Sequence, residues 1–130
     1  MEKKRTKKPL RKRLEDKADR VFSRYIRKKY ADWRGYCECY TCGIIKPLEE
    51  MDNGHYIKRS FRGTRWDEDN CRPQCTSCNQ YRGGMQDQFA LHLEKDLGFG
   101  ILQELDKRAL KITKLTSDDL RAIIEKYDER

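Results

Sequence analysis

Apolar side chains recur at helical spacing in the first third of the chain. Between Leu14 and Ile26 they stand three or four residues apart, which places them on one face of a helix. The members of this face are Leu14, Ala18, Val21, Phe22, Tyr25 and Ile26. The pattern predicts an N-terminal helical segment over 14–34, with the helix itself over about 14–31 and an end near Gly35.

The last third, residues 85–130, contains three further stretches of this kind. The first predicted helix carries Phe89, Leu93 and Leu97 and ends at Gly98, a residue type common at helix C-termini. The apolar positions of the second are Ile101, Leu102, Leu105 and Ala109, and those of the third are Leu120, Ile123, Ile124 and Tyr127. Thr116 or Ser117 is suited to cap the third helix.

Residues 36–84 lack long helical periodicity. They hold two Cys-x-x-Cys pairs, five of the eight glycines and two of the three prolines. This composition is typical of a loop-rich metal module with short strands. We therefore expect a single α+β domain over 14–130, in which a core over 36–84 packs among helices from both ends of the chain.

The overall composition favours a metal-stapled protein in a reducing compartment. With 36% hydrophobic and 40% charged residues in a chain of 130, the core is lean, and small cores often need a metal. No apolar run approaches the ~20 residues of a membrane span, and no apolar stretch follows the N-terminal charges as in a secretory signal. We expect a cytoplasmic protein without a membrane partner, whose six cysteines are metal ligands rather than disulfides.

The net charge of +8 is concentrated at the N-terminus. Residues 1–13 hold eight basic residues and one acidic residue, whereas the other 117 residues hold 22 basic and 21 acidic. We expect a disordered basic tail over 1–13 that favours polyanions without regard to sequence, the alternative being a merely solubilising arm. Residues 85–130, with eight basic and ten acidic residues, are a poor DNA-facing surface.

The two cysteine pairs predict one structural zinc site. Zn²⁺ prefers four tetrahedral ligands, and a Cys-x-x-Cys turn points two thiolates at one ion. The four predicted ligands are Cys39, Cys42, Cys75 and Cys78. Two pairs of buried free thiols are the alternative. Cys37 and Cys71 are not part of either pair. We expect both to be small core residues, the alternative for Cys37 being that it replaces a neighbouring zinc ligand.

Residues between and beside the pairs suggest hydrolysis of a phosphodiester. That reaction requires a base to activate water, a divalent cation at the phosphate and cationic groups around it. His55 is a candidate base, because neutral imidazole takes up a proton near pH 7. Asn79 offers an amide oxygen suited to Mg²⁺ or Mn²⁺, and Asn70 is placed to fix the loop that orients the histidine. The candidate phosphate contacts are Arg59, Arg62, Arg65 and Arg82.

This pattern of cysteines, His55, Asn70 and Asn79 resembles the HNH, or ββα-metal, nucleases, and within them the phage recombination endonucleases called NinG or Rap. The resemblance implies a zinc-stapled ββα-metal fold and a phage protein that cuts branched DNA, such as Holliday junctions and D-loops, in the bacterial host. It gives His55 the role of general base, Asn70 a loop-positioning role and Asn79 a metal-ligand role.

Two positions depart from the HNH pattern. Many members have a metal-binding Asp or His directly before the catalytic histidine, where this chain has Gly54, and many end the motif with His where this chain has Asn79. Asp52 is a substitute ligand, because two residues along a strand return to the same face.

Three readings of function therefore stay open. They are a branch-specific nuclease, a nuclease that prefers particular sequences, and a zinc module that binds nucleic acid without cutting it. A resolvase that cuts two strands symmetrically is expected to dimerise, and the C-terminal helices are the expected interface.

Overall fold

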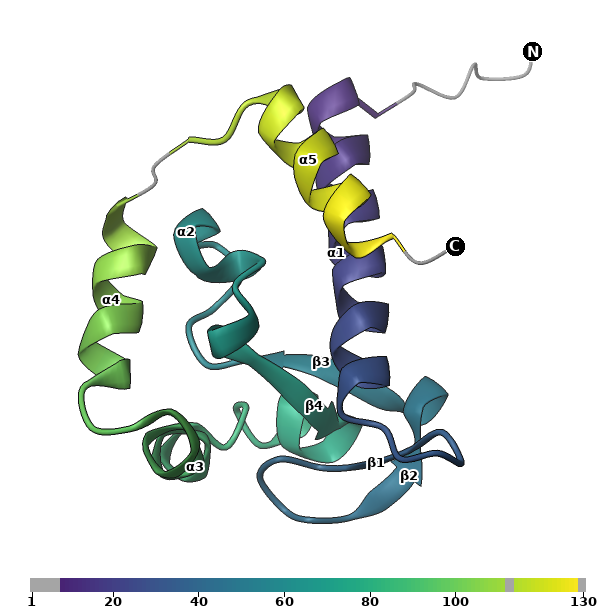
Figure 1. The fold of residues 1–130 in the computed structure, drawn as a ribbon, viewed down its shortest axis with the longest axis vertical. Helices are drawn as coiled ribbons and strands as arrows, with labels where there is room; N and C mark the ends of the chain where they lie inside the picture. The colour runs from purple at the N-terminus through teal and green to yellow at the C-terminus, as the bar shows by residue number, and fades with distance from the viewer. Residues whose placement is uncertain (1–7, 112–113, 129–130) are drawn as a thin grey trace.

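The computed structural model describes residues 8–111 and 114–128, which form a mixed α+β fold (Figure 1). Its helices are α1 (Leu10–Lys29), α2 (Arg62–Arg65), α3 (Gln86–Leu97), α4 (Ile101–Lys111) and α5 (Ser117–Tyr127). Its strands are β1 (Tyr36–Glu38), β2 (Ile45–Pro47), β3 (Met51–His55) and β4 (Cys71–Cys75). Shorter turns are the 3-10 helices η1 (Leu48–Glu50) and η2 (Glu68–Asn70) and the π-helix η3 (Ser77–Tyr81).

Helix α1 begins at Leu10, four residues before the expected start, so the tail boundary at residue 13 is wrong. Pro9 occupies the N-cap, a place where a missing backbone N–H costs nothing. Asp16 pairs with Lys12 one turn earlier and with Lys8 before the helix, which offsets part of the repulsion among the basic residues of the first turns. Residues 1–7 of the expected tail lie outside the described residues.

The strands form two separate antiparallel pairs. In the first, β1 pairs with β2 and carries the first cysteine knuckle in its connecting turn. In the second, β3 pairs with β4 in a register that sets Met51 opposite Cys75 and His55 opposite Cys71. The helical turn η3 follows β4 directly, so the second pair and η3 form a strand–strand–helix unit.

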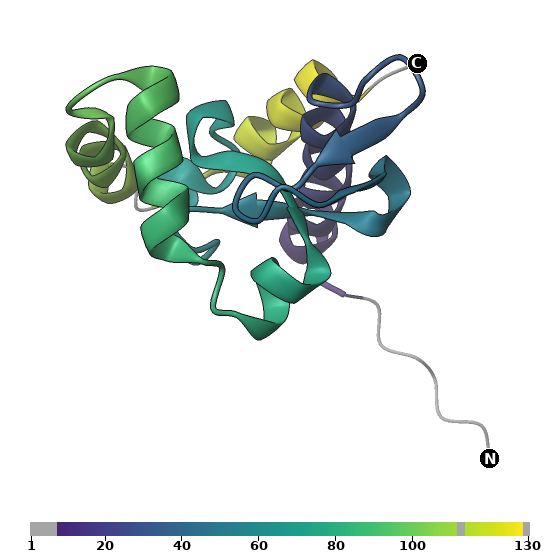
Figure 2. The same ribbon diagram turned by 90° about the horizontal axis from the view of Figure 1, so that it is seen from below.

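Helices cover the β3–β4 pair on two sides. Figures 1 and 2 both show α1 and α5 together on one side, and α3 with α4 on the other. One apolar cluster joins α1, α5 and the start of β4 around Phe22, Leu120 and Cys71, and a second joins α3 to α4 around Phe89 and Leu105. The strand pair that carries His55 thus packs against α1, and the α3–α4 cluster reaches the turn after β3 through Tyr56 and Ile57.

The half-buried carboxylate of Glu68 links α1 and α5 to η2, the turn before β4. Glu68 accepts hydrogen bonds from the hydroxyl groups of Tyr25 and Tyr127, each at 3.1 Å, and pairs with Lys29 at 3.1 Å. The rings of Phe22 and Tyr127 meet edge to face, with centroids 4.8 Å apart. The C-terminal helix is therefore part of the fold that positions the strands.

The C-terminal helices follow the sequence pattern closely. Helix α3 ends at Gly98, whose positive φ of 97° suits a residue without a side chain. Thr116, rather than Ser117, caps α5, and its hydroxyl and the Asp119 carboxylate form a reciprocal capping box. Within the described residues, no helix has both the length and the apolar character that crossing a membrane requires.

Candidate metal centre and catalytic cleft

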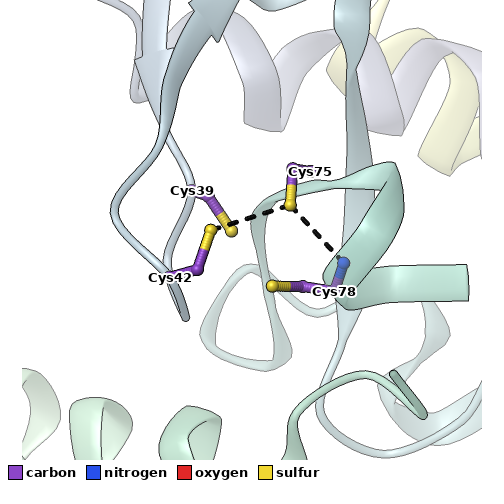
Figure 3. Close-up of side chains that lie close together, drawn as sticks. All are labelled: Cys39, Cys42, Cys75 and Cys78. Carbon is purple, nitrogen blue, oxygen red and sulfur yellow. Dashed lines mark hydrogen bonds between the residues drawn. The ribbon is translucent and has the colours of Figure 1, made fainter. Parts of the chain in front are cut away.

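The two cysteine pairs converge as the sequence predicts (Figure 3). Cys39 and Cys42 come from the β1–β2 turn, and Cys75 and Cys78 come from the end of β4 and the start of η3. All four sulfurs lie within 4.8 Å of one another, and the Cys42 and Cys75 sulfurs are 3.7 Å apart. Four sulfurs at zinc-bond length around one ion would be about 3.8 Å apart.

The thiols of the cluster have different surroundings. Burial raises the pKa of Cys42 and that of Cys78, the latter to about 12, whereas Cys39 is more acidic than an ordinary thiol. Burial, the largest influence on Cys39, opposes ionisation, but it is outweighed by backbone N–H groups, first that of Cys75, and by the Thr41 hydroxyl. The pKa of Cys39 is thereby lowered to about 6. The backbone N–H of Cys78 points at the Cys75 sulfur from 3.4 Å. Four thiols at this spacing suit a closed tetrahedral zinc site, which has no position left for chemistry.

The two remaining cysteines lie outside the cluster. The Cys37 thiol is buried and contacts the Arg27 carbonyl at 3.1 Å, and Cys71 is buried against the α1–α5 core. Burial raises the pKa of both thiols, that of Cys71 well above its ordinary value. They are neutral core residues, and Cys37 does not replace a member of the zinc cluster.

Beside the zinc cluster lies an open cleft of about 950 Å³. Its walls come from α1, from β3 and the turn after it, from η3 and from residues 83–86. Three residues expected at a catalytic site, His55, Asp52 and Asn79, lie together in this cleft. The cluster and the cleft are adjacent in the chain, because Asn79 follows the zinc-cluster residue Cys78.

His55 is fixed by a backbone contact. Its Nε2 lies 2.9 Å from the carbonyl oxygen of Arg65. A carbonyl only accepts hydrogen bonds, so Nε2 carries the proton and Nδ1 of the neutral ring is left unprotonated. Burial lowers the pKa of His55, although the Arg65 carbonyl works in the opposite direction. The ring is therefore a neutral base at pH 7.

The carbonyl that holds His55 belongs to a well-anchored residue. Arg65 is only 8% exposed, and its guanidinium binds the Asp19 carboxylate at 2.6 Å and approaches Glu15 at 3.5 Å. Both carboxylates project from α1. A buried, bidentate ion pair of this kind fixes geometry even where its net contribution to stability is small. Helix α1 thus sets the position of the histidine ring through Arg65.

Asp52 stands next to Asn79 on the floor of the cleft. One carboxylate oxygen accepts hydrogen bonds from the amide of Asn79 at 3.1 Å and from that of Gln80 at 2.9 Å. A half turn of the Asn79 amide group presents its oxygen to the same space. Carboxylate and amide oxygens are ligands that Mg²⁺ and Mn²⁺ prefer, so these residues fit a divalent cation.

Asn70 is buried and does not line the cleft. Its side-chain oxygen accepts from the Ile57 backbone N–H at 2.8 Å, and its NH₂ group donates to the Ile57 and Thr64 carbonyls. These bonds close the loop that runs from the end of β3 to Arg65. The geometry suits the loop-positioning role expected from the sequence, outside the lining of the cleft.

The four candidate arginines have different surroundings. Arg65 is buried in its ion pairs, and Arg62 binds Glu15 at 3.2 Å, so neither guanidinium is free for a phosphate in this conformation. Arg59 lies on the cleft rim, with 62% of its side chain exposed and a longer 3.4 Å contact to Asp19. Arg82 is exposed at the end of η3, outside the cleft lining.

The side chain of Gln74 explains why a glycine precedes His55. A Cβ at Gly54 would lie 2.0 Å from the Gln74 side-chain oxygen. Gln74 cannot easily move away, because its NH₂ group donates to the Thr41 hydroxyl and the Gly84 carbonyl. The usual acidic ligand of the HNH pattern is therefore sterically excluded at Gly54, and Asp52 is the carboxylate of β3 that reaches the cleft.

Several residues of the site were missed by the sequence analysis. Asp19, Ser23 and Arg27 bring α1 into the cleft wall, and Gln80 contacts Asp52. The four-residue spacing of Glu15 and Asp19 beside the apolar face of α1 was a usable signal for inward-facing carboxylates. Nothing in the sequence indicated the contact between His55 and a backbone carbonyl ten residues away.

Together, the fold and its side chains define a small mixed α+β protein with a candidate four-thiolate zinc centre beside an open polar cleft. The chain belongs to the bacteriophage lambda NinG protein family, whose model matches residues 1–130.

Individual relatives agree with this family. The chain is 25% identical over 114 residues to "Protein ninG" of Salmonella phage P22, a match that covers 87% of this chain and 53% of the relative. It is 26% identical over 114 residues to "Protein ninG" of Escherichia phage 933W, covering 87% of this chain and 54% of the relative. The chain thus spans about half the length of the curated relatives it matches. No solved structure matches it.

Proposed function

We propose that this protein is a metal-dependent DNA endonuclease of the HNH type. The observation that carries the proposal is the meeting of His55, Asp52 and Asn79 in one cleft, with the histidine held as a neutral base. The antiparallel β3–β4 pair followed by η3 supports it, because HNH nucleases carry their motif on such a strand–strand–helix unit.

In the proposed reaction, His55 acts through Nδ1. That nitrogen takes a proton from a water molecule, whose oxygen forms a new bond to phosphorus while the bond to the leaving sugar oxygen breaks. The Arg65 carbonyl holds the ring in the required tautomer and stabilises the imidazolium that forms. Asn70 keeps the intervening loop closed so that this carbonyl stays in place.

Asp52 and Asn79 would hold the divalent cation. When bound, Mg²⁺ or Mn²⁺ supplies positive charge for the charge that develops on the phosphate and leaving oxygen. Gln80 keeps the Asp52 carboxylate directed into the cleft. With few protein ligands, such a site retains several waters, which magnesium tolerates. The zinc centre would be structural.

The proposed substrate is branched DNA, such as a Holliday junction or a D-loop. This choice rests on the resemblance to phage recombination endonucleases and on membership of the NinG family. The cleft is open rather than a narrow pocket for one base, which suits a backbone that bends or forks.

The test is cleavage by purified, zinc-loaded protein of a four-way junction and of linear duplexes with the same sequences, with and without Mg²⁺ or Mn²⁺. Cutting of the junction that depends on the added cation, with little cutting of the linear duplexes, supports the proposal. Equal cutting of both at particular sequences favours a sequence-preferring HNH nuclease. Binding without cutting of branched, linear or single-stranded DNA would establish the zinc-containing binding module instead.

A further inference from the structure

A row of basic side chains runs along the outer face of α1. Arg13, Lys17, Arg20 and Arg24 are exposed and spaced by four, three and four residues, which places them on one side of the helix. We call these four residues the basic stripe. At ~1.5 Å per residue, the stripe is about 16 Å long. Figure 1 shows α1 along one edge of the molecule, from the N-terminal end down to the β1–β2 pair.

The positive charge of the stripe is not neutralised by the helix that carries it. The three acidic residues of α1 are paired with other cations: Glu15 with Arg62, Asp19 with Arg65, and Asp16 with Lys8 and Lys12. Among the described residues, no ion pair involves any of the four stripe residues. The stripe therefore presents four positive charges to its surroundings.

The stripe also leads to the cleft. Arg27 stands seven residues after Arg20, on nearly the same side of α1, and lines the cleft together with Ser23. Lys58 and Arg59, both exposed, line the same cleft. A polyanion that rests on the stripe and continues past Arg27 would therefore reach the rim of the cleft that holds His55 and Asp52.

The surface between the stripe residues favours a nucleic acid over a protein. Protein interfaces usually contain an apolar centre. Between residues 13 and 24 of the described chain, no large apolar side chain is exposed. Duplex DNA presents a phosphate of each strand every ~3.4 Å along its axis, so the stripe matches about five base pairs of backbone.

We propose that the basic stripe binds the phosphate backbone of one double-stranded DNA arm and guides it into the cleft. This inference rests on the proposed function, because it places the duplex flanking the site of cleavage. Its contacts carry no base readout, so the arm is bound by charge and shape alone. The contribution of the stripe to binding should therefore be equal for duplexes of any sequence.

The test is the salt dependence of binding to a 20-base-pair duplex, measured by fluorescence anisotropy without added divalent cation so that the DNA stays intact. The variant carries Lys17→Gln, Arg20→Gln and Arg24→Gln. Each lost phosphate contact lowers the slope of log K against log salt by about 0.9, so we expect the slope to fall by about 2 to 3. A second variant, Lys17→Arg with Arg20→Lys and Arg24→Lys, keeps the charge and should keep the wild-type slope.

The matched control removes three exposed lysines from the helices on the other parts of the surface: Lys95→Gln, Lys107→Gln and Lys126→Gln. It changes the net charge equally, and its slope should stay within about 0.5 of the wild-type value. An equal fall in the control and the stripe variant, or an unchanged slope in the stripe variant, would overturn the inference. One outcome is that the wild type cuts no DNA while the salt-dependence slope still falls in the stripe variant and not in the control. In that case the nuclease proposal fails, and the stripe remains a DNA-binding surface.

Discussion

The proposed chemistry depends on how a few residues of the cleft are held. His55 is set by a carbonyl rather than by another side chain, and the carbonyl is set in turn by the ion pair between Arg65 and Asp19. Gly54 leaves room for Gln74, and Asp52 is the carboxylate of β3 that lines the cleft. Each of these relations joins residues that are distant in the sequence or involves a backbone atom.

The lowered pKa of His55 predicts the pH dependence of cleavage. A general base works when neutral, and burial disfavours the charged imidazolium. We expect the single-turnover rate to stay level from pH 7 to below the ordinary histidine value of ~6.5, and to fall only at lower pH. The zinc content is measured at each pH as the control. A rate that is already half-maximal at or above pH 6.5 would contradict the buried, neutral base.

Arg65 offers a test of positioning against DNA contact. We expect Arg65→Met to lower the single-turnover rate at saturating DNA by roughly 10- to 100-fold, because the carbonyl that orients His55 loses its anchor. The dissociation constant for DNA should change little. Arg65→Lys, which keeps one ionic contact to Asp19, should recover part of the rate. A large loss of DNA affinity with an unchanged rate would instead show that Arg65 contacts phosphate, as the sequence suggested.

At the residue scale, the sequence predicted the four-cysteine cluster better than the residues that hold His55 in place. Cys39, Cys42, Cys75 and Cys78 converge because the spacing of two knuckles already encodes one metal site. The arginines could not be sorted from sequence, since exposed and buried guanidinium groups follow the same local pattern. Only the position of Asp19 on α1 decides that Arg65 turns inward.

At the scale of elements, helical periodicity was a reliable guide and strand pairing was not available from the pattern. The three C-terminal helices fall where their apolar positions predicted, because each carries a full face that must be buried. The start of α1 was misplaced because the basic residues around Leu10 were interpreted as a disordered tail, although Leu10 stands four residues before Leu14. Pro9 at the N-cap and the pair between Lys12 and Asp16 favour the helix there. The β3–β4 register emerges from tertiary packing of short strands.

The zinc knuckles join β1–β2 to β4 and η3, so their loss should affect the fold as a unit. We expect Cys78→Ser to reduce bound zinc below one per chain and to lower the unfolding temperature by roughly 5–10 °C, which corresponds to about 2 kcal/mol for a domain of this size.

Cys37→Ser is the matched control for this change, because that thiol is equally buried but lies outside the cluster. It should keep full zinc and shift the unfolding temperature much less. Zinc content and unfolding temperature are measured by metal analysis and calorimetry. A Cys78→Ser variant with one zinc per chain and the wild-type unfolding temperature would contradict a structural role for the zinc site.

At the scale of the whole molecule, the surface is divided by character. The basic stripe and the cleft lie along α1 and the strands, whereas α3, α4 and the turn between them expose apolar side chains, namely Leu91, Leu97, Phe99 and Leu110. Phe99 is fully exposed. This division separates a surface suited to DNA from one suited to another protein chain.

We predict that the apolar surface of α3 and α4 mediates a homodimer, because symmetric cutting of a junction needs two active sites. Sedimentation equilibrium of the wild type should give twice the chain mass, with or without junction DNA. Phe99→Ser combined with Leu110→Ser should give the monomer mass while the thermal unfolding of the chain remains cooperative. A wild type that is monomeric both alone and on a junction would contradict the predicted dimer.

The central claim is that His55 is the general base of a nuclease cleft. The most direct measurement is the single-turnover rate of junction cleavage in Mg²⁺ or Mn²⁺ for the wild type and His55→Ala, each with its zinc content and unfolding temperature determined. We predict that His55→Ala keeps its zinc and its fold but cuts about 10² to 10⁴ times more slowly. Equal rates for the two proteins, after purification that excludes contaminating nuclease, would contradict it.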